Sequence, residues 1–291
     1  MTNFDYFIVL AEMRTGSNLL EANLNTLVGV SCHGEAFNPS FVGRPKTEEL
    51  LGIDQATREE NPELLLEQIK NSDALAGFRF FHNHDPRILQ TCLSDPRCAK
   101  VILTRNPVDS FVSWKIAQAT GQWKLTNPTH AKTISVDFEP DAFVAHLEAL
   151  MAFQARVQHA LQTSGQTAFY IGYDDLRDVD VMNGLAAFLG TDSRLSNINK
   201  KLKKQNPEPL DQKVRNFDEM QQALVLENVV GKRYVDNEVN ALLRVAKLLK
   251  DFGVLNLSPE SALETGVVCS FMLHNLGHFL GLQVHDVGWQ L

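Results

Sequence analysis

The chain has 291 residues, a formal net charge of −8, 44% hydrophobic and 21% charged residues, a composition that is typical of a globular protein. The negative charge argues against a general nucleic-acid-binding protein, so an anionic ligand would need a local basic site. No apolar run approaches the roughly 20 residues that a membrane-spanning helix needs, and the N-terminus lacks the features of a signal peptide. The four scattered cysteines indicate reduced thiols, so we expect a cytoplasmic protein. The composition leaves homo-oligomerisation open.

The first structural signal is an apolar run that turns into a helix. Residues 7–11 read as a buried strand, the turn that follows is Arg14-Thr15-Gly16-Ser17, and apolar residues then recur at helical spacing. We expect Ser17 to cap this helix. Free N–H groups at a helix start, together with the helix dipole, attract an anion. The turn lacks the Gly-Lys-Ser/Thr ending of ATPases, which disfavours a nucleoside triphosphatase.

Strand and helix patterns then alternate along the chain. Strands are predicted at 27–31, 74–81, 100–104 and 168–172, and helices at 62–71, 86–92, 107 onward, 141–163, 179–189, 217–228 and 239–252. Residues 38–61 look irregular, and residues 120–138 form a loop-like segment of the kind that covers an enzyme site. This alternation predicts an α/β protein, a three-layer, P-loop-like domain whose mainly parallel central sheet is flanked by helices.

A second candidate anion site follows the strand at 100–104. Arg105-Asn106-Pro107 comes directly after the strand, and Pro107 suits the first turn of a helix. Ser113 lies eight residues after Arg105, about two helical turns along. This segment and the Arg14 turn resemble the two phosphate-binding motifs of sulfotransferases that use 3′-phosphoadenosine 5′-phosphosulfate (PAPS).

The resemblance implies PAPS as co-substrate and transfer of a sulfuryl group to an acceptor hydroxyl. Arg14 would stabilise the leaving phosphate, and Arg105 with Ser113 would hold the 3′-phosphate. The donor-binding residues implied in this way are Arg14, Thr15, Gly16, Ser17, Asn18, Arg105 and Ser113. No metal site is expected. The alternative is a catalytically inactive protein that binds 3′-phosphoadenosine nucleotides.

A base must remove the acceptor's proton, and the loop after the second strand offers His33 and Glu35. The resemblance implies a His in aryl and steroid sulfotransferases and a Glu shortly after the second strand in the trehalose and heparan types. Glu35, followed by Ala-Phe, is similar to the latter, so we prefer Glu35 and keep His33 as the alternative.

Three further polar residues accompany the third strand. His82 and His84 follow it, at a place that lines the acceptor site in the family that the chain resembles. Arg79 lies on the strand itself and, if buried, needs a partner. That partner is either a ligand or a structural ion pair.

A basic run at Lys200–Lys204 leads into Gln205-Asn206. This segment resembles bacterial carbohydrate sulfotransferases of the nodulation-factor and trehalose types, which implies a sugar acceptor. A solvated helix face is the alternative interpretation of the lysines.

The sulfotransferase resemblance covers residues 5–255, so we predict a sulfotransferase domain at 1–256 and an extension at 257–291. Residues 268–288 resemble the metal-binding core of prolidase-type dipeptidases, and His278 matches one metal ligand there. The carboxylate ligands of such a site come from a larger domain, for which this chain lacks room. We therefore expect the extension to be non-catalytic.

Overall fold

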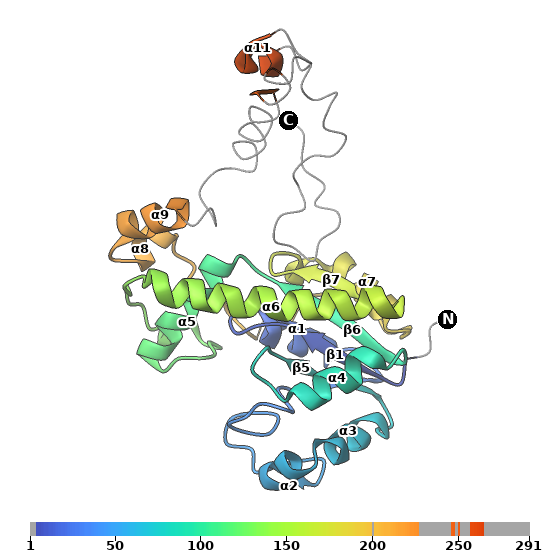
Figure 1. Cartoon of the computed structure of the whole chain (residues 1–291). Helices are drawn as coiled ribbons and strands as arrows, with labels where there is room; N and C mark the ends of the chain where they lie inside the picture. The colour runs from blue at the N-terminus through green and yellow to red at the C-terminus, as the bar shows by residue number, and fades with distance from the viewer. Residues whose placement is uncertain (1–3, 200, 227–245, 248–249, 251–256, 265–291) are drawn as a thin grey trace. The chain divides into compact units, whose positions relative to one another are not determined.

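The computed structural model of the protein describes residues 4–199, 201–226, 246–247, 250 and 257–264 (Figure 1). The chain divides into two compact units, residues 1–215 and 216–291. The first unit contains the central sheet. In the second, α9 (Phe217–Leu226) and α11 (Pro259–Glu264) are described. Most of the helix expected at 239–252, the predicted boundary at 256 and the dipeptidase-like stretch lie outside the described residues.

The core of the first unit is a five-stranded sheet in which every pair of neighbours is parallel. Its strand order is β2-β5-β1-β6-β7. The strands are β1 (Tyr6–Leu10), β2 (Val30–Cys32), β5 (Leu75–Phe80), β6 (Cys98–Thr104) and β7 (Phe169–Gly172). Because the strands are parallel, the loops that follow all five emerge at one edge of the sheet. Binding sites of open α/β sheets lie at this edge.

The helices of the first unit are α1 (Ser17–Leu24), α2 (Gln55–Glu60), α3 (Pro62–Lys70), α4 (Pro86–Ser94), α5 (Pro107–Thr120), α6 (Pro140–Ser164), α7 (Val179–Phe188) and α8 (Leu210–Lys213). Single 3₁₀ turns, η1 (Pro128–His130) and η2 (Asp175–Arg177), punctuate the connections. Within the described residues, each helix is either too short or too polar to traverse a lipid bilayer.

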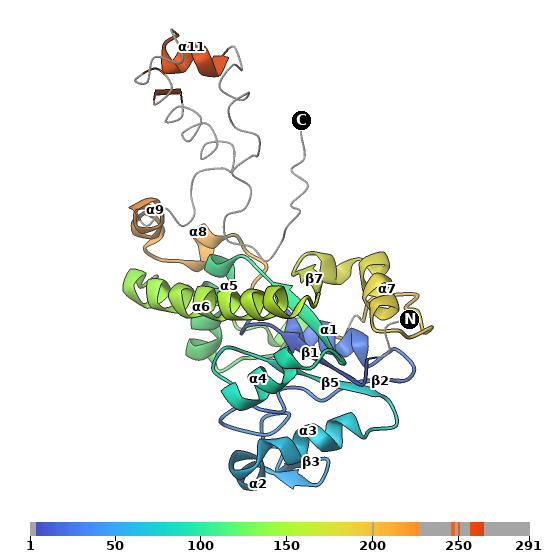
Figure 2. The same ribbon diagram turned by 45° about the vertical axis from the view of Figure 1, so that its right-hand side comes forward.

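Both faces of the sheet are covered. Side chains alternate between the faces along each strand, and Phe7 and Val9 of β1 belong to a buried cluster with Leu20 of α1 and Leu185 of α7. The opposite face meets α3 and α4, and α4 in turn contacts α6. Figures 1 and 2 show this arrangement. The predicted α/β fold, a mainly parallel sheet between helical layers, is therefore confirmed.

Two local predictions were wrong. The second strand lies at Val30–Cys32 instead of 27–31, because residues 25–29 form the turns that leave α1. Residues 38–61 are not wholly irregular, since they include α2 and a hairpin of β3 (Glu49–Leu50) and β4 (Ile53–Asp54). Asp54 caps α2 by accepting a hydrogen bond from the Thr57 N–H, a local signal that the sequence carried.

Candidate functional site

The turn between β1 and α1 has an unusual backbone. Arg14 has a φ of 67° and Gly16 a φ of 90°, both in the left-handed region that favours glycine. A Cβ atom on Gly16 would lie 2.8 Å from the Tyr173 ring and 2.6 Å from Leu176. Position 16 therefore requires glycine for two reasons: its positive φ, and the close approach of the loop after β7, which leaves no space for a Cβ atom.

Ser17 does not cap α1, which corrects the prediction. Gly16 occupies the cap position without a side-chain hydrogen bond. The Ser17 hydroxyl instead accepts a hydrogen bond of 3.0 Å from Nη1 of the buried Arg79. The first N–H groups of the helix therefore lack a side-chain cap, and a helix start of this kind suits an anion.

The Arg14 side chain connects three segments that are distant in sequence. Its Nε donates to the Ser113 hydroxyl at 3.0 Å, its Nη1 donates to the Trp123 carbonyl at 2.9 Å, and its Nη2 donates to the Gln205 amide oxygen. Burial and the nearby Arg105 charge lower the pKa of Arg14 to about 10. Because this pKa is well above 7, the guanidinium stays charged at neutral pH. Its three hydrogen bonds fix its orientation.

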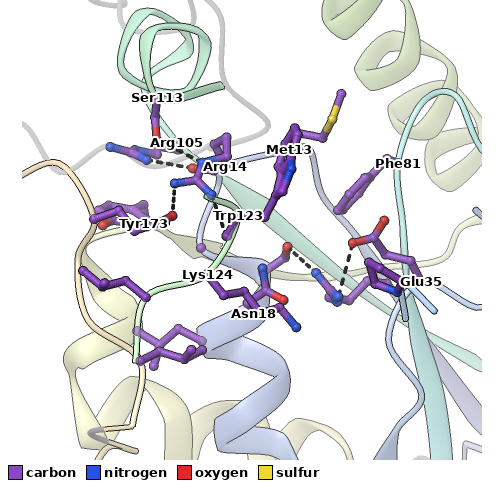
Figure 3. A pocket seen from close by; sticks show the side chains of 18 of the residues that line it. Met13, Arg14, Asn18, Glu35, Phe81, Arg105, Ser113, Trp123, Lys124 and Tyr173 are labelled. Carbon is purple, nitrogen blue, oxygen red and sulfur yellow. Dashed lines mark hydrogen bonds and ion pairs between the residues drawn. The ribbon is translucent and has the colours of Figure 1, made fainter. Parts of the chain in front are cut away.

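Arg105 lies beside this group at the end of β6. Its Nη1 donates to the Arg14 carbonyl at 2.7 Å, and its guanidinium stacks over the Tyr173 ring, 4.1 Å from the ring centroid. Asn106 caps α5 by accepting from the Val108 N–H at 2.9 Å. The structure thus brings both sequence motifs to one place, as Figure 3 shows.

Glu35 lies on the other side of the same cavity, near Phe81 (Figure 3). Its Oε1 pairs with Arg79 Nη2 at 3.2 Å, and its Oε2 accepts from Asn38 Nδ2 at 2.7 Å. Arg79 also pairs with Glu21, at 2.7 Å between Nε and Oε2. The sequence left open whether Arg79 contacts a ligand or forms a structural ion pair. The structure shows the ion pairs, and Arg79 also lines the cavity, where a ligand could contact it.

The loop that carries Glu35 is fixed by the buried Arg58 of α2. Arg58 Nη1 donates to three backbone carbonyls of this loop, those of Ala36 at 3.1 Å, Asn38 at 2.7 Å and Phe41 at 3.2 Å. The groups that Arg58 binds are backbone carbonyls, and the Asn38 side chain adds a further bond by accepting from the Ser40 N–H at 2.8 Å. The sequence interpretation missed Arg58 because it missed α2.

The cavity between these groups has a volume of about 520 Å³. The cations that line it are Arg14, Arg79, Arg105, Lys124, Arg177, Lys203 and Lys204. Glu35 is the only carboxylate among the described lining residues. Lys124 lines the site, and burial and the neighbouring Arg79 lower its pKa there. Such a lining is suited to a ligand with several negative charges.

Two segments of the lining were identified only in part from the sequence. The loop after α5 contributes Trp123, Lys124 and Leu125, which agrees with the expectation of a covering segment. The basic run is not a helix within its described residues, and residues 202–206 line the cavity. The two segments are joined, since Lys203 N–H donates to the Leu125 carbonyl at 2.9 Å.

Two of the expected site residues lie outside the cavity lining. Thr15 is buried and its hydroxyl donates to the Glu12 carbonyl at 2.7 Å, which braces the turn. His33 lies 3.3 Å from the Ser31 hydroxyl through Nε2, and burial and the Arg44 charge lower its pKa. Of the two candidate bases, Glu35 lines the cavity, whereas His33 is not among the described lining residues.

The histidines after β5 occupy different environments. His82 is bound by the buried Glu12, with 2.7 Å between Nδ1 and Oε2 and 3.0 Å between its N–H and Oε1. This hydrogen bond raises the pKa of His82. The His84 side chain is completely buried, and its Nε2 lies 3.9 Å from Glu35 Oε2. Neither histidine is among the described residues that line the cavity.

No protein-family model matches the chain. Curated proteins that match part of it include Xaa-Pro dipeptidases. The protein from Stenotrophomonas maltophilia (strain K279a) is 53% identical over 57 residues, 20% of this chain and 13% of the dipeptidase. Xaa-Pro dipeptidase 2 from Idiomarina loihiensis is 44% identical over 75 residues, 26% of this chain and 17% of that protein. These short matches fit the dipeptidase-like stretch noted in the C-terminal sequence.

Solved structures with a similar arrangement include three sulfotransferases or sulfotransferase domains. The sulfotransferase from Alicyclobacillus acidocaldarius has a TM-score of 0.44 and 17% identity, covering 69% of this chain and 86% of its own. Mouse sulfotransferase SULT7A1 complexed with PAP has a TM-score of 0.37 and 17% identity, covering 67% and 64%. The sulfotransferase domain of the Synechococcus PCC 7002 olefin synthase has a TM-score of 0.35 and 14% identity, covering 76% and 94%.

Proposed function

We propose that the first unit transfers a sulfuryl group from PAPS to the hydroxyl of a sugar acceptor. The observation that carries this proposal is the meeting of two anion-binding motifs. Arg14 Nε lies 3.0 Å from Ser113 Oγ, and Arg105 Nη1 lies 2.7 Å from the Arg14 carbonyl. Both motifs follow neighbouring parallel strands, β1 and β6, and their residues share one cavity.

The chemistry of the lining fits the donor. PAPS carries a 3′-phosphate and a 5′-phosphosulfate, and six of the cationic lining residues have no carboxylate partner among the described residues. They are Arg14, Arg105, Lys124, Arg177, Lys203 and Lys204. Arg105 and Ser113 would hold the 3′-phosphate. Arg14, the turn at 15–17 and Asn18 would hold the 5′ end, where negative charge grows on the leaving phosphate.

Glu35 is the proposed base. Sulfuryl transfer resembles phosphoryl transfer in that the protein mainly aligns the groups and stabilises spreading negative charge. The acceptor hydroxyl gives its proton to Glu35 while its oxygen bonds to sulfur, and the bond from sulfur to the phosphate oxygen breaks. The position of Glu35 on the cavity wall opposite Arg14 supports this role over His33.

A sugar acceptor is supported by the wall around Glu35. Asn38, Ser40 and Asn83 offer amide and hydroxyl groups there, and Phe41 and Phe81 offer apolar surface. A few placed polar groups within an apolar wall are typical of small-molecule sites. The resemblance of the segment after Lys204 to bacterial carbohydrate sulfotransferases points the same way.

The test combines binding and turnover. Purified protein is titrated calorimetrically with 3′,5′-adenosine bisphosphate and then incubated with ³⁵S-labelled PAPS and panels of sugars, glycolipids and phenols. Labelled sugar product supports the proposal. Binding without transfer to any acceptor would favour the inactive nucleotide-binding protein, and absence of binding would overturn both.

The proposed sulfuryl transfer does not involve the C-terminal segment, which resembles Xaa-Pro dipeptidases instead. The dipeptidase matches of 57 and 75 residues are longer than the predicted extension, and the longer one approaches the length of the second compact unit, residues 216–291. We propose that the dipeptidase-like segment begins before residue 257. It covers less than a fifth of those dipeptidases, and we propose that it has no peptidase activity.

A further inference from the structure

The side chain of His84 stands out because it is polar, buried and unbonded. Its exposed fraction is 0%, and neither ring nitrogen has a hydrogen-bond partner among the described residues. Buried polar atoms are nearly always satisfied, so an exception calls for an explanation. Phe80 and Phe81 flank the ring, with centroids 5.1 and 5.0 Å away.

Glu35 lies close to His84 but does not form a hydrogen bond with it. The distance of 3.9 Å between His84 Nε2 and Glu35 Oε2 is beyond hydrogen-bond range. The Glu35 oxygens already face Arg79 Nη2 at 3.2 Å and Asn38 Nδ2 at 2.7 Å. A carboxylate oxygen accepts hydrogen bonds and has none to donate. If Nε2 presents its lone pair, the two atoms have no hydrogen between them, which explains the gap.

We propose that His84 is a positioning residue that accepts a hydrogen bond from Glu35 once Glu35 has taken the acceptor's proton. This inference rests on the proposed sulfuryl transfer. The acceptor O–H bond breaks, its proton moves to the Glu35 carboxyl group, and the new O–H turns toward the bare Nε2 of His84. The bond exists only after proton abstraction, so it favours that step over substrate binding.

The charges around His84 keep it in the form that this role needs. Glu35 faces it from the loop after β2, Arg79 from β5, Arg58 from α2 and His82 from its own loop. Burial and the Arg79, Arg58 and His82 charges lower the pKa of His84 to about 3. The ring is thus neutral at physiological pH and keeps one nitrogen free to accept.

The kinetic test compares His84→Leu, which removes the acceptor, with His84→Gln, whose amide oxygen replaces it. One hydrogen bond that forms during the reaction corresponds to about a tenfold effect. We therefore expect kcat to fall about tenfold in His84→Leu, with KM for PAPS unchanged, and to recover substantially in His84→Gln. His159→Gln, an exposed position on α6, is the control.

Two comparisons separate this role from simple packing. In a Glu35→Gln background, His84→Leu should cause no further loss, because His84 acts only through Glu35; a further tenfold loss would overturn the proposal. The second comparison is between the two His84 variants, because the amide oxygen of His84→Gln can still accept from Glu35 whereas His84→Leu cannot. An equal loss in both variants, or an unchanged kcat in His84→Leu, would also overturn it.

Nitrogen-15 NMR of histidine-labelled wild type tests the same point without turnover and without a variant that must fold. The His84 resonance should show a neutral ring with hydrogen on Nδ1 and none on Nε2 at pH 7. Hydrogen on Nε2 would overturn the proposal. Failure of the wild type to transfer sulfuryl groups would instead sink the proposed function, so the two failures are distinguishable.

Discussion

Arg14 and Ser113 are hydrogen-bonded at 3.0 Å, although 99 residues separate them in the chain. The bond links the turn after β1 with the second helical turn of α5, because β1 and β6 are neighbours in the sheet. Residues assigned to the two ends of one donor molecule therefore belong to a single network, and substitution at either end should affect donor handling.

Arg105→Ala should weaken the binding of 3′,5′-adenosine bisphosphate by roughly 10- to 150-fold, the usual range for a hydrogen bond to a charged group. Ser113→Ala should cost about tenfold or less, since it removes a neutral donor. Calorimetry measures both. Arg156→Ala, an exposed position on α6, is the matched control. Wild-type affinity in both site variants would show that the donor binds elsewhere.

Arg14→Ala should lower kcat by roughly 10²- to 10³-fold, the typical loss when a group that stabilises developing charge is removed. Its hydrogen bonds to Ser113 and Trp123 hold the guanidinium in place, so the loss should fall on turnover more than on acceptor KM. Steady-state rates with labelled PAPS measure this. A tenfold effect or less would assign the leaving-group cation to another residue, with Lys124 the first candidate.

Glu35→Gln should reduce kcat by about 10²- to 10⁴-fold, the contribution of a well-placed base. Glutamine keeps the shape and the contact with Arg79 while losing basicity. His33→Ala should retain most activity, because His33 is not among the described residues that line the cavity. The reverse pattern, with activity kept in Glu35→Gln and lost in His33→Ala, would make His33 the base.

The pair formed by His82 and Glu12 should make stability depend on pH. The hydrogen bond to Glu12 raises the pKa of His82 above its unfolded value of about 6.5. Its stabilisation is therefore full below that pH and is lost as the pH rises through the folded-state pKa. The difference in thermal midpoint between wild type and His82→Gln should be larger at pH 5.5 than at pH 9. An equal difference at both values would contradict this.

A chain that ends at Leu226, the last residue of α9, should keep sulfuryl transfer, because all described cavity residues precede residue 207. The full chain should contain no stoichiometric zinc or manganese by elemental analysis. Stoichiometric metal, or cleavage of a proline dipeptide that truncation abolishes, would instead show a working site in the C-terminal unit. A lower melting temperature alone would show only that the removed segment packs.

The sequence predicted the parts of the site that follow from local chemistry. The alternation of apolar strands and helices predicted the parallel sheet, and the eight-residue spacing from Arg105 to Ser113 identified the second anion-binding motif. Contacts between residues that are distant in sequence could not be predicted from local patterns. The Ser17 hydroxyl binds Arg79 instead of capping its own helix, and no local rule foretells a partner 62 residues away.

The basic run at Lys200–Lys204 shows the same limit. Its basic character was visible, but a solvated helix face explained it equally well. In the structure its Lys203 N–H donates to the Leu125 carbonyl, and both segments line the cavity. This hydrogen bond joins two backbone groups, so the identities of the residues do not reveal it.

The anchoring of the Glu35 loop by Arg58 has a consequence for protein engineering. One guanidinium binds the carbonyls of Ala36, Asn38 and Phe41, and these three contacts do not involve the side chains at 39–41. A library randomised at these three positions should preserve the path of the chain while presenting new surfaces to incoming molecules. Under the proposed function, such a library would vary the acceptor wall while Glu35 and the donor-binding residues stay unchanged.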